Sequence, residues 1–162
     1  MREFAFRPIG IVHSPIKRQS DAPIQPRYSE LEGEIEIFDE FSSGLKHLDG
    51  FSHITVTFVF DRSEGCELVT MPYMGEEKRG VFATRSPYRP NPIGISVLNL
   101  LGVDGNRVRV RRLDMLDETP VLDIKPYVPG FVDEDKVRRG WLEGRPENTD
   151  GSKSPRDKRE ER

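Results

Sequence analysis

Cysteine and histidine are scarce in this chain of 162 residues, which contains one cysteine and three histidines. The lone Cys66 excludes an internal disulfide and fits a reducing compartment. The scattered histidines leave no spacing typical of a zinc site, so we expect no metal. No apolar run is long enough to span a membrane, and the first residues lack the apolar core of a signal peptide. We therefore expect a cytoplasmic protein with no membrane partner.

A glycine-rich phosphate loop is also missing. The chain has 14 glycines, yet no Gly-x-Gly-x-x-Gly pattern follows the first predicted strand, which argues against a Rossmann-type nucleotide site. A net charge of −3 argues against a general binder of polyanions. The length suits one domain with a sizeable core.

What the sequence does contain is alternation of apolar and polar residues, which predicts strands. The expected strands are residues 4–12, 34–38, 54–60, 80–84, 93–101, 107–113 and 121–127, with a tight turn at Asp104, Gly105 and Asn106. Helical signals are confined to residues 42–48 and 133–142. The prediction is a mainly β fold, a single antiparallel β-barrel with one or two short helices. Residues 1–142 form the expected domain, and residues 143–162 a charged tail too polar to order itself.

Two predicted strands carry charge of one sign on one face. Glutamates occupy every second position of one (Glu30, Glu32, Glu34 and Glu36), and arginines do so in the other (Arg107, Arg109 and Arg111). Alternate residues of a strand lie about 6.6 Å apart, a spacing at which three cations can follow a phosphate backbone. The alternative is the solvated face of an antiparallel strand.

The most informative segment is residues 84–96, Thr-Arg-Ser-Pro-Tyr-Arg-Pro-Asn-Pro-Ile-Gly-Ile-Ser. Pro87, Pro90 and Pro92 each fix φ, remove a backbone donor and push the preceding residue away from helix. A stiff polar loop between two strand-like runs can present preset donors to a ligand. A plain connection between strands is the alternative.

This segment and several others, taken in order, resemble the TrmO family, also called TsaA-like or YaeB-like. The other runs are Ile9-Gly10-Ile11-Val12-His13-Ser14-Pro15, Phe51-Ser52-His53-Ile54 and Asp117-Glu118-Thr119-Pro120-Val121-Leu122-Asp123-Ile124-Lys125-Pro126-Tyr127. The resemblance spans residues 6–129 and agrees with the barrel. It implies an S-adenosyl-L-methionine-dependent methyltransferase that acts on tRNA, at the exocyclic nitrogen of a threonylcarbamoylated adenosine next to the anticodon.

The resemblance also implies where the donor binds. Matching positions for donor contacts are Gln25, Pro26, Arg27, Phe60, Asp61, Arg85, Ile95, Leu113, Asp114, Met115 and Leu116. Asp117 and Thr119 are weaker candidates, and turn chemistry before Pro120 is the alternative for Asp114 and Asp117. Tyr88, Arg89 and Asn91 are the expected RNA contacts, because a tyrosine can stack on an unpaired base. No catalytic side chain is assigned.

Two other functions stay open at this point: a non-enzymatic module that binds S-adenosylmethionine, and an RNA-binding barrel that uses the arginine stripe. The loop with Arg85 favours the two functions that bind S-adenosylmethionine over the RNA-binding barrel. The chain lacks the further C-terminal domain of larger family members, so a homodimer is expected to complete the site. The apolar residues within 127–142 are the candidate dimer surface.

Overall fold

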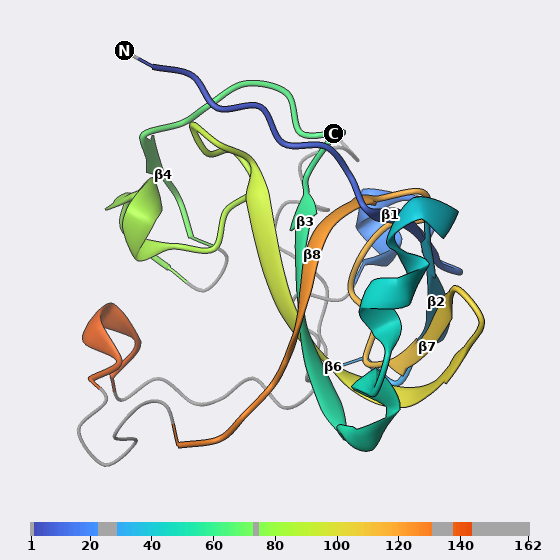
Figure 1. Cartoon of the computed structure of the whole chain (residues 1–162). Helices are drawn as coiled ribbons and strands as arrows, with labels where there is room; N and C mark the ends of the chain where they lie inside the picture. Colours follow the sequence, from blue (N-terminus) through green and yellow to red (C-terminus); the bar gives the residue numbers. More distant parts are fainter. Residues whose placement is uncertain (1, 23–28, 73–74, 131–137, 144–162) are drawn as a thin grey trace.

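In the computed structural model, which describes residues 2–22, 29–72, 75–130 and 138–143, six antiparallel strands close into a barrel (Figure 1). Their order around the barrel is β1-β2-β7-β6-β3-β8, and β8 pairs with β1 to complete it. The strands are β1 (Gly10–His13), β2 (Glu32–Ile37), β3 (His53–Val59), β6 (Ile93–Asp104), β7 (Arg107–Arg111) and β8 (Pro120–Pro126). The mainly β barrel predicted from sequence is confirmed.

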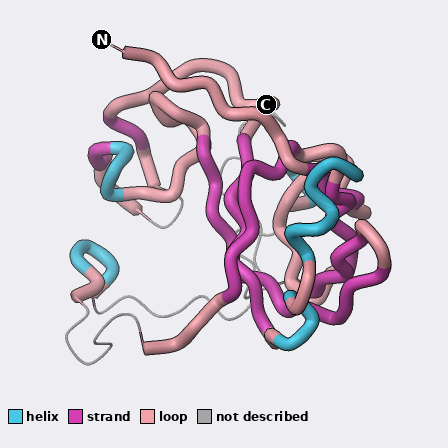
Figure 2. Tube along the Cα trace, viewed as in Figure 1, coloured by secondary structure: helices cyan, strands magenta, loops and turns pink. Residues whose placement is uncertain are grey.

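Two further strands, β4 (Val69–Thr70) and β5 (Arg79–Gly80), pair only with each other. They belong to the arm, our name for the described residues between β3 and β6, which lies beside the barrel in Figures 1 and 2. Helical segments in the described parts of the chain are all short 3₁₀ turns: η1 (Gln19–Asp21), η3 (Asp39–Leu45), η4 (Leu48–Gly50), η5 (Val81–Ala83) and η7 (Gly140–Leu142). None of the described helices is long and apolar enough to cross a membrane.

Alternating side chains fill the barrel, as strand geometry requires. On β3, Ile54, Val56 and Phe58 are buried while the residues between them are only partly so. The same alternation places Val108 and Val110 of β7 inside. Other core residues come from the remaining strands and from the segment after β7: Val12, Ile35, Ile37, Leu98, Leu113, Met115 and Val121.

Strand β6 is the longest element and changes partner along its length. Ile93 to Asn99 pair with β3, whereas Asn99 to Asp104 pair with β7. The two-residue turn Gly105–Asn106 joins β6 to β7, with Gly105 at φ 58°, so the predicted hairpin is confirmed. Before Asn99, the edge of β6 that faces away from β3 is not covered by β7.

Two strand predictions are wrong in extent. Residues 4–12 were expected to form one strand, but β1 begins at Gly10, because its partner Ile37 is the last residue of β2. Of residues 80–84, only Gly80 lies in a strand, β5, and the turn η5 follows, since the Thr84 N–H donates to the Val81 carbonyl at 3.0 Å. The helix expected at 42–48 appears as η3 and η4, and residues 133–137 and 144–162 lie outside the described residues.

Gly94 permits the close approach of β6 to the aromatic core. A Cβ atom added there would lie 2.3 Å from Cζ of Phe58, whose ring packs edge-on against Phe60 at 5.1 Å between centroids. We predict that Gly94→Ala destabilises the protein by about 1–3 kcal/mol, because a buried ring must move. Gly44→Ala, which meets nothing within 4 Å, is the matched control. Equal unfolding midpoints for the two variants in urea would contradict the prediction.

Candidate functional site

The proline-rich loop after η5 is held by its own polar groups. The Thr84 hydroxyl donates to the Val81 carbonyl at 2.9 Å and accepts from the Ser86 N–H at 3.3 Å. The Ser86 hydroxyl in turn accepts from the Tyr88 N–H at 3.3 Å. These hydroxyls therefore link the loop to itself by local hydrogen bonds, and the predicted rigidity of the segment stays a prediction.

Arg89 lies across the same loop. Its Nη1 donates to the carbonyls of Val81, Thr84 and Ser86 at 3.2, 2.9 and 3.3 Å. The guanidinium also lies 6.0 Å from the centre of the Phe82 ring. Arg89 was predicted to contact RNA; in the structure its Nη1 holds the loop, and the RNA contact stays a prediction. Of the other two predicted RNA contacts, Asn91 is exposed and Tyr88 is partly buried.

Arg85 leaves this loop toward the uncovered edge of β6. Its Nη2 donates to the Ile95 carbonyl at 2.5 Å. On the β3 side of β6, the Pro92 carbonyl accepts from the Phe60 N–H and the Leu100 N–H donates to the Ser52 carbonyl, at the two ends of β3. Because carbonyls alternate between the two edges of a strand, the Ile95 carbonyl points to the opposite edge. The structure thus brings together two residues that the sequence placed in one site.

Asp114 is the third member of this group. Its Oδ2 accepts a hydrogen bond from the buried Ser96 hydroxyl at 3.0 Å, while its Oδ1 is buried with no hydrogen-bond partner. Burial raises the pKa of Asp114 to about 6, against the opposing effects of the Ser96 hydrogen bond and the Arg85 charge. A buried carboxylate oxygen without a partner is costly, and such groups cluster at functional sites. Ser96 was not predicted, although it ends the informative segment.

The residues on either side of Asp114 have mainly structural roles. The side chains of Leu113 and Met115 are buried in the core. The Leu113 N–H donates to the Leu31 carbonyl at 3.1 Å, and its carbonyl accepts from the Ser29 hydroxyl at 2.6 Å. Because these two side chains are buried, Leu113 and Met115 can contact a ligand only through main-chain atoms. The contacts with the methyl donor predicted for Asp114 and Leu116 stay predictions.

Phe60 and Asp61 follow β3, at the end of the barrel where β6 begins. The Phe60 N–H donates to the Pro92 carbonyl at 2.7 Å, and the ring is partly buried against Phe58. Asp61 is exposed, with one oxygen 4.0 Å from Nε of Arg62. Within the described chain, neither residue forms a hydrogen bond or ion pair with Arg85 or Asp114. The predicted contacts with the methyl donor at Gln25, Pro26 and Arg27 lie outside the described residues.

Asp117 fixes the end of β1 to the loop between β7 and β8. Its carboxylate accepts from Nζ of Lys17 at 2.5 Å and from the Ser14 N–H at 2.9 Å. These hydrogen bonds, Lys17 first, lower the pKa of Asp117 below its ordinary value. Thr119 is buried, and its carbonyl accepts from the Val12 N–H at 3.0 Å. The structure favours a structural role for Asp117, whereas Asp114 lies near Arg85 and bonds to Ser96 on β6.

The arginine stripe on β7 is neutralised by the glutamates of β2. In the ladder, Glu32, Glu34 and Glu36 pair with Arg111, Arg109 and Arg107. Arg107 reaches Glu34 at 3.0 Å and Glu36 at 3.2 Å, and Arg111 reaches Glu32 at 2.8 Å. The two charged faces predicted separately thus form one neutral surface. This arrangement favours the solvated-face interpretation over phosphate tracking.

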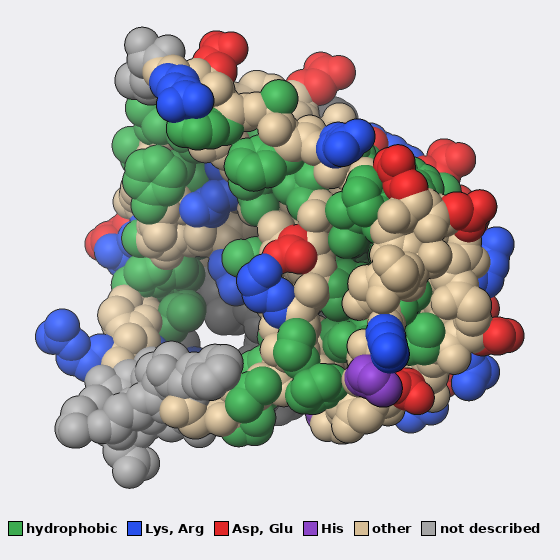
Figure 3. Space-filling view, in the orientation of Figure 1, with side chains coloured by type: hydrophobic (Ala, Val, Ile, Leu, Met, Phe, Trp, Pro, Cys, Tyr) green, Lys and Arg blue, Asp and Glu red, His purple; other side chains and the backbone are tan. Residues whose placement is uncertain are grey.

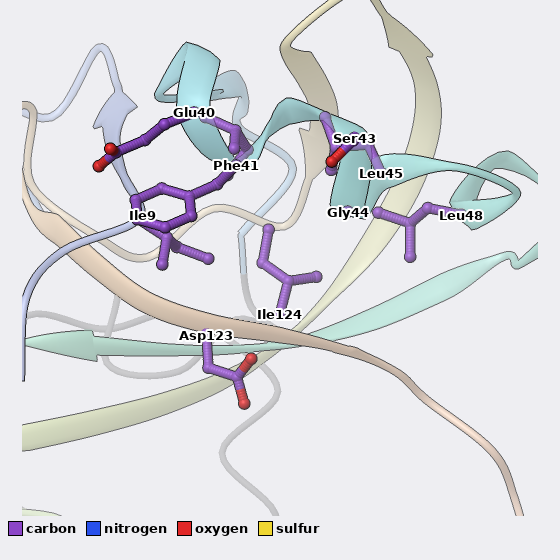
Figure 4. Close-up of a pocket in the computed structure, with 10 residues that line it drawn as sticks. Ile9, Glu40, Phe41, Ser43, Gly44, Leu45, Leu48, Asp123 and Ile124 are labelled. Carbon is purple, nitrogen blue, oxygen red and sulfur yellow. The ribbon is translucent and has the colours of Figure 1, made fainter.

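A cavity of about 370 Å³ lies elsewhere, between η3 and β8. In Figure 4, Ile9, Phe41 and Ile124 point toward one another, whereas Asp123 points away from them. None of its lining residues is basic, so it offers no cation for a carboxylate. Within the described ranges, no group of three or more His, Cys, Asp or Glu side chains is placed to hold a metal ion.

Asp114 gives the stability of the protein a pH dependence. Its pKa of about 6 exceeds the ordinary value of 3.8, so the folded state holds the proton more tightly than the unfolded state. Ionised Asp114 therefore costs stability above pH 6, and this cost disappears as the pH falls toward 4. We predict that Asp114→Asn raises the free energy of unfolding at pH 8 by about 1–3 kcal/mol, with no gain at pH 4.

Asp117→Asn is the matched control for this measurement, because the pKa of Asp117 is shifted the other way. Its carboxylate stabilises the fold above the ordinary pKa, and this contribution is lost as the pH falls through the lowered pKa. Asp117→Asn should therefore destabilise the protein at pH 8. Denaturant titrations at both pH values check the two signs. A destabilised Asp114→Asn variant at pH 8 would refute the assignment of an uncompensated charge.

Comparison with known proteins identifies the family of this chain. Residues 11–134 match the family model described as the tRNA-methyltransferase O N-terminal domain. A probable S-adenosyl-L-methionine-binding protein of Pyrococcus abyssi is 55% identical over 139 residues, covering 85% of this chain and 76% of the relative. The tRNA (adenine(37)-N6)-methyltransferase of Escherichia coli is 39% identical over 140 residues, covering 80% of this chain and 60% of that protein.

Solved structures indicate the same family. The crystal structure of TrmO from Pseudomonas aeruginosa superposes with a TM-score of 0.72 at 34% identity, covering 86% of this chain and 63% of that one. Another crystal structure of TrmO gives a TM-score of 0.74 at 34% identity, with 86% and 64% coverage. The chain thus spans about two thirds of these structures. On the family match, the relatives and the shared fold together, this protein belongs to the TrmO N-terminal domain family.

Proposed function

We propose that this protein binds S-adenosyl-L-methionine at the β6 edge and transfers its methyl group to an adenosine of tRNA. The observation that carries the proposal is the grouping of Arg85, Ile95 and Asp114, with opposite charges and an unpartnered carboxylate oxygen. The Pyrococcus relative is named for donor binding and the Escherichia coli relative for methylation of tRNA adenine 37. The cytoplasm, where reduced Cys66 is stable, is the proposed location.

The charges of the site suit the methionine end of the donor, which carries a carboxylate and an ammonium group. The Arg85 guanidinium is a planar fork that can bind a carboxylate through two hydrogen bonds. Asp114 offers an anionic oxygen that lacks a partner, and an ammonium group would satisfy it. The Ile95 carbonyl, on an uncovered strand edge, is an acceptor for a further donor group.

When bound, S-adenosylmethionine supplies a methyl group on an electrophilic sulfonium. The protein then has to hold donor and nucleophile in line and exclude water. The stapled loop suits this task, because Arg85 is held on backbone that Arg89 fixes at three carbonyls. We propose the exocyclic nitrogen of threonylcarbamoyladenosine, next to the anticodon, as the methyl acceptor.

A non-enzymatic donor-binding module is the second candidate. The archaeal relatives are named only as binding proteins, which favours this alternative. Both functions use the same donor site, so donor affinity cannot separate them. An assay of methyl transfer to RNA separates the two functions.

The deciding experiment is nucleoside mass spectrometry of tRNA after incubation with the protein and isotope-labelled S-adenosylmethionine. The expected result is one labelled methyl group on threonylcarbamoyladenosine, and no label on tRNA that lacks this modification. Label on unmodified adenosine would keep the methyltransferase and change its substrate. Donor binding by calorimetry without any labelled nucleoside would select the binding module.

Arg85→Ala should weaken the binding of S-adenosylmethionine by roughly 1.5–3 kcal/mol, the contribution of a charge-assisted hydrogen bond. Arg109→Ala is the matched control, because Arg109 lies in the neutral β2–β7 ladder, where its strand partner is Glu34. Calorimetry with and without a chelator measures both affinities. Equal donor affinity in the two variants would place the site on another loop.

We also propose that the working unit is a homodimer. Apolar side chains are exposed on the arm, where Leu68, Val69 and Phe82 are 62%, 59% and 77% exposed, and on the outer face of β6. Figure 3 shows this apolar surface over the arm and the neighbouring barrel wall. Such a surface typically marks an interface. In the surface proposed from sequence, 127–142, the described Trp141 donates its indole N–H to Ala83 of the same chain.

Light scattering across a dilution series should give a dimer at micromolar concentration. Leu68→Lys should shift it toward monomer, because a charge on the arm would be buried at the interface. Phe6→Lys, at a position 75% exposed outside the arm, is the control. A monomeric wild type with full methylation rate would remove the need for a partner.

A further inference from the structure

Trp141, the single tryptophan of the chain, joins the C-terminal turn to the loop that carries Arg85. Its indole Nε1–H donates to the Ala83 carbonyl at 2.8 Å, across 58 positions of sequence. The Arg79 guanidinium lies 5.5 Å from the centre of its ring. Trp141 lies beyond residues 11–134, the region matched by the family model, so this contact joins a residue outside that region to Ala83 within it.

The turn η7 that carries Trp141 closes on itself. The Leu142 N–H donates to the Arg139 carbonyl at 3.2 Å, and the Glu143 N–H donates to the Gly140 carbonyl at 3.1 Å. The Glu143 side chain accepts from the Arg139 N–H at 2.6 Å. Gly140 has φ 57°, a left-handed conformation that glycine adopts without strain. The indole is therefore presented from a locally ordered turn.

The Ala83 carbonyl lies between the carbonyls of Val81 and Thr84 that Arg89 holds, so a hydrogen bond to Ala83 adds a further restraint on the loop. Arg89 engages the carbonyls of Val81, Thr84 and Ser86, and Trp141 engages that of Ala83. Apolar anchoring of this turn is slight, because Val81 is buried while Phe82 is 77% exposed. A segment with so few buried contacts opens easily, so each polar tether on it matters.

We propose that Trp141 is a positioning residue for donor binding. Acting through the Ala83 carbonyl, it holds η5 so that Arg85, two residues further on, reaches the Ile95 carbonyl and the vicinity of Asp114. Trp141 itself does not touch the donor. The inference rests on the proposed function for its donor-binding consequence, and on the contacts above for its structural part.

Trp141→Phe is the sharpest test, because it removes the N–H and keeps a ring for Arg79. Loss of one hydrogen bond should raise the dissociation constant for S-adenosylmethionine about fivefold. The methylation rate at saturating donor should stay within about twofold, since the chemistry is untouched. Phe51→Leu, at an exposed ring beside η4 and β3, is the matched control and should change neither quantity.

Hydrogen–deuterium exchange of the donor-free protein supplies a second readout that does not depend on donor binding. Trp141→Phe should speed exchange in a peptide covering residues 81–89 and leave the β3 peptide unchanged. Unchanged exchange in residues 81–89, or a donor affinity equal to wild type, overturns the inference. A wild-type protein that binds no donor overturns the proposed function, and with it this role of Trp141.

Discussion

The change of partner along β6 is the constraint on which the candidate site depends. From Ile93 to Asn99 the strand pairs with β3, and from Asn99 to Asp104 it pairs with β7. The edge of its first half that faces away from β3 therefore has no strand partner. An uncovered strand edge presents main-chain donors and acceptors that a fold must cap or use. Here Arg85 caps the Ile95 carbonyl, and Asp114, just beyond β7, reaches Ser96 of the same strand. The barrel topology thus makes the site.

The electrostatics of the molecule follow from where each charge lies. On β2 and β7, glutamates and arginines face each other across neighbouring strands and neutralise one another at the surface, where such pairs contribute little to stability. Asp117 ties β1 to the following loop through Lys17 and Ser14, which is a structural use of a carboxylate. Asp114 differs from these, because its buried oxygen has no partner and its charge opposes folding. Such a group calls for an explanation, and the ligand proposed above supplies one.

Rigidity at the site comes from side-chain tethers on a loop rather than from sheet hydrogen bonds. The prolines limit the backbone, Arg89 staples three carbonyls, and Trp141 holds a fourth from a distant part of the chain. Preorganised groups bind a ligand with a smaller loss of conformational entropy. The interface proposed for a homodimer lies on the same arm, so assembly and donor binding share one structural element.

The sequence by itself determined the strands of the barrel and the β6–β7 turn. It also predicted a stiff proline loop and assigned Arg85, Ile95 and Asp114 to one candidate site. These follow from local rules: alternation, turn residues and motif resemblance. Only the tertiary structure decided that β1 begins at Gly10, that η5 replaces a strand, that Arg89 turns inward, and that the arginine stripe is neutral. Each of these depends on which strand lies next to which, and sequence period does not specify neighbours. Ser96 and Trp141 were missed for the same reason, because each gains its role from a residue distant in the chain.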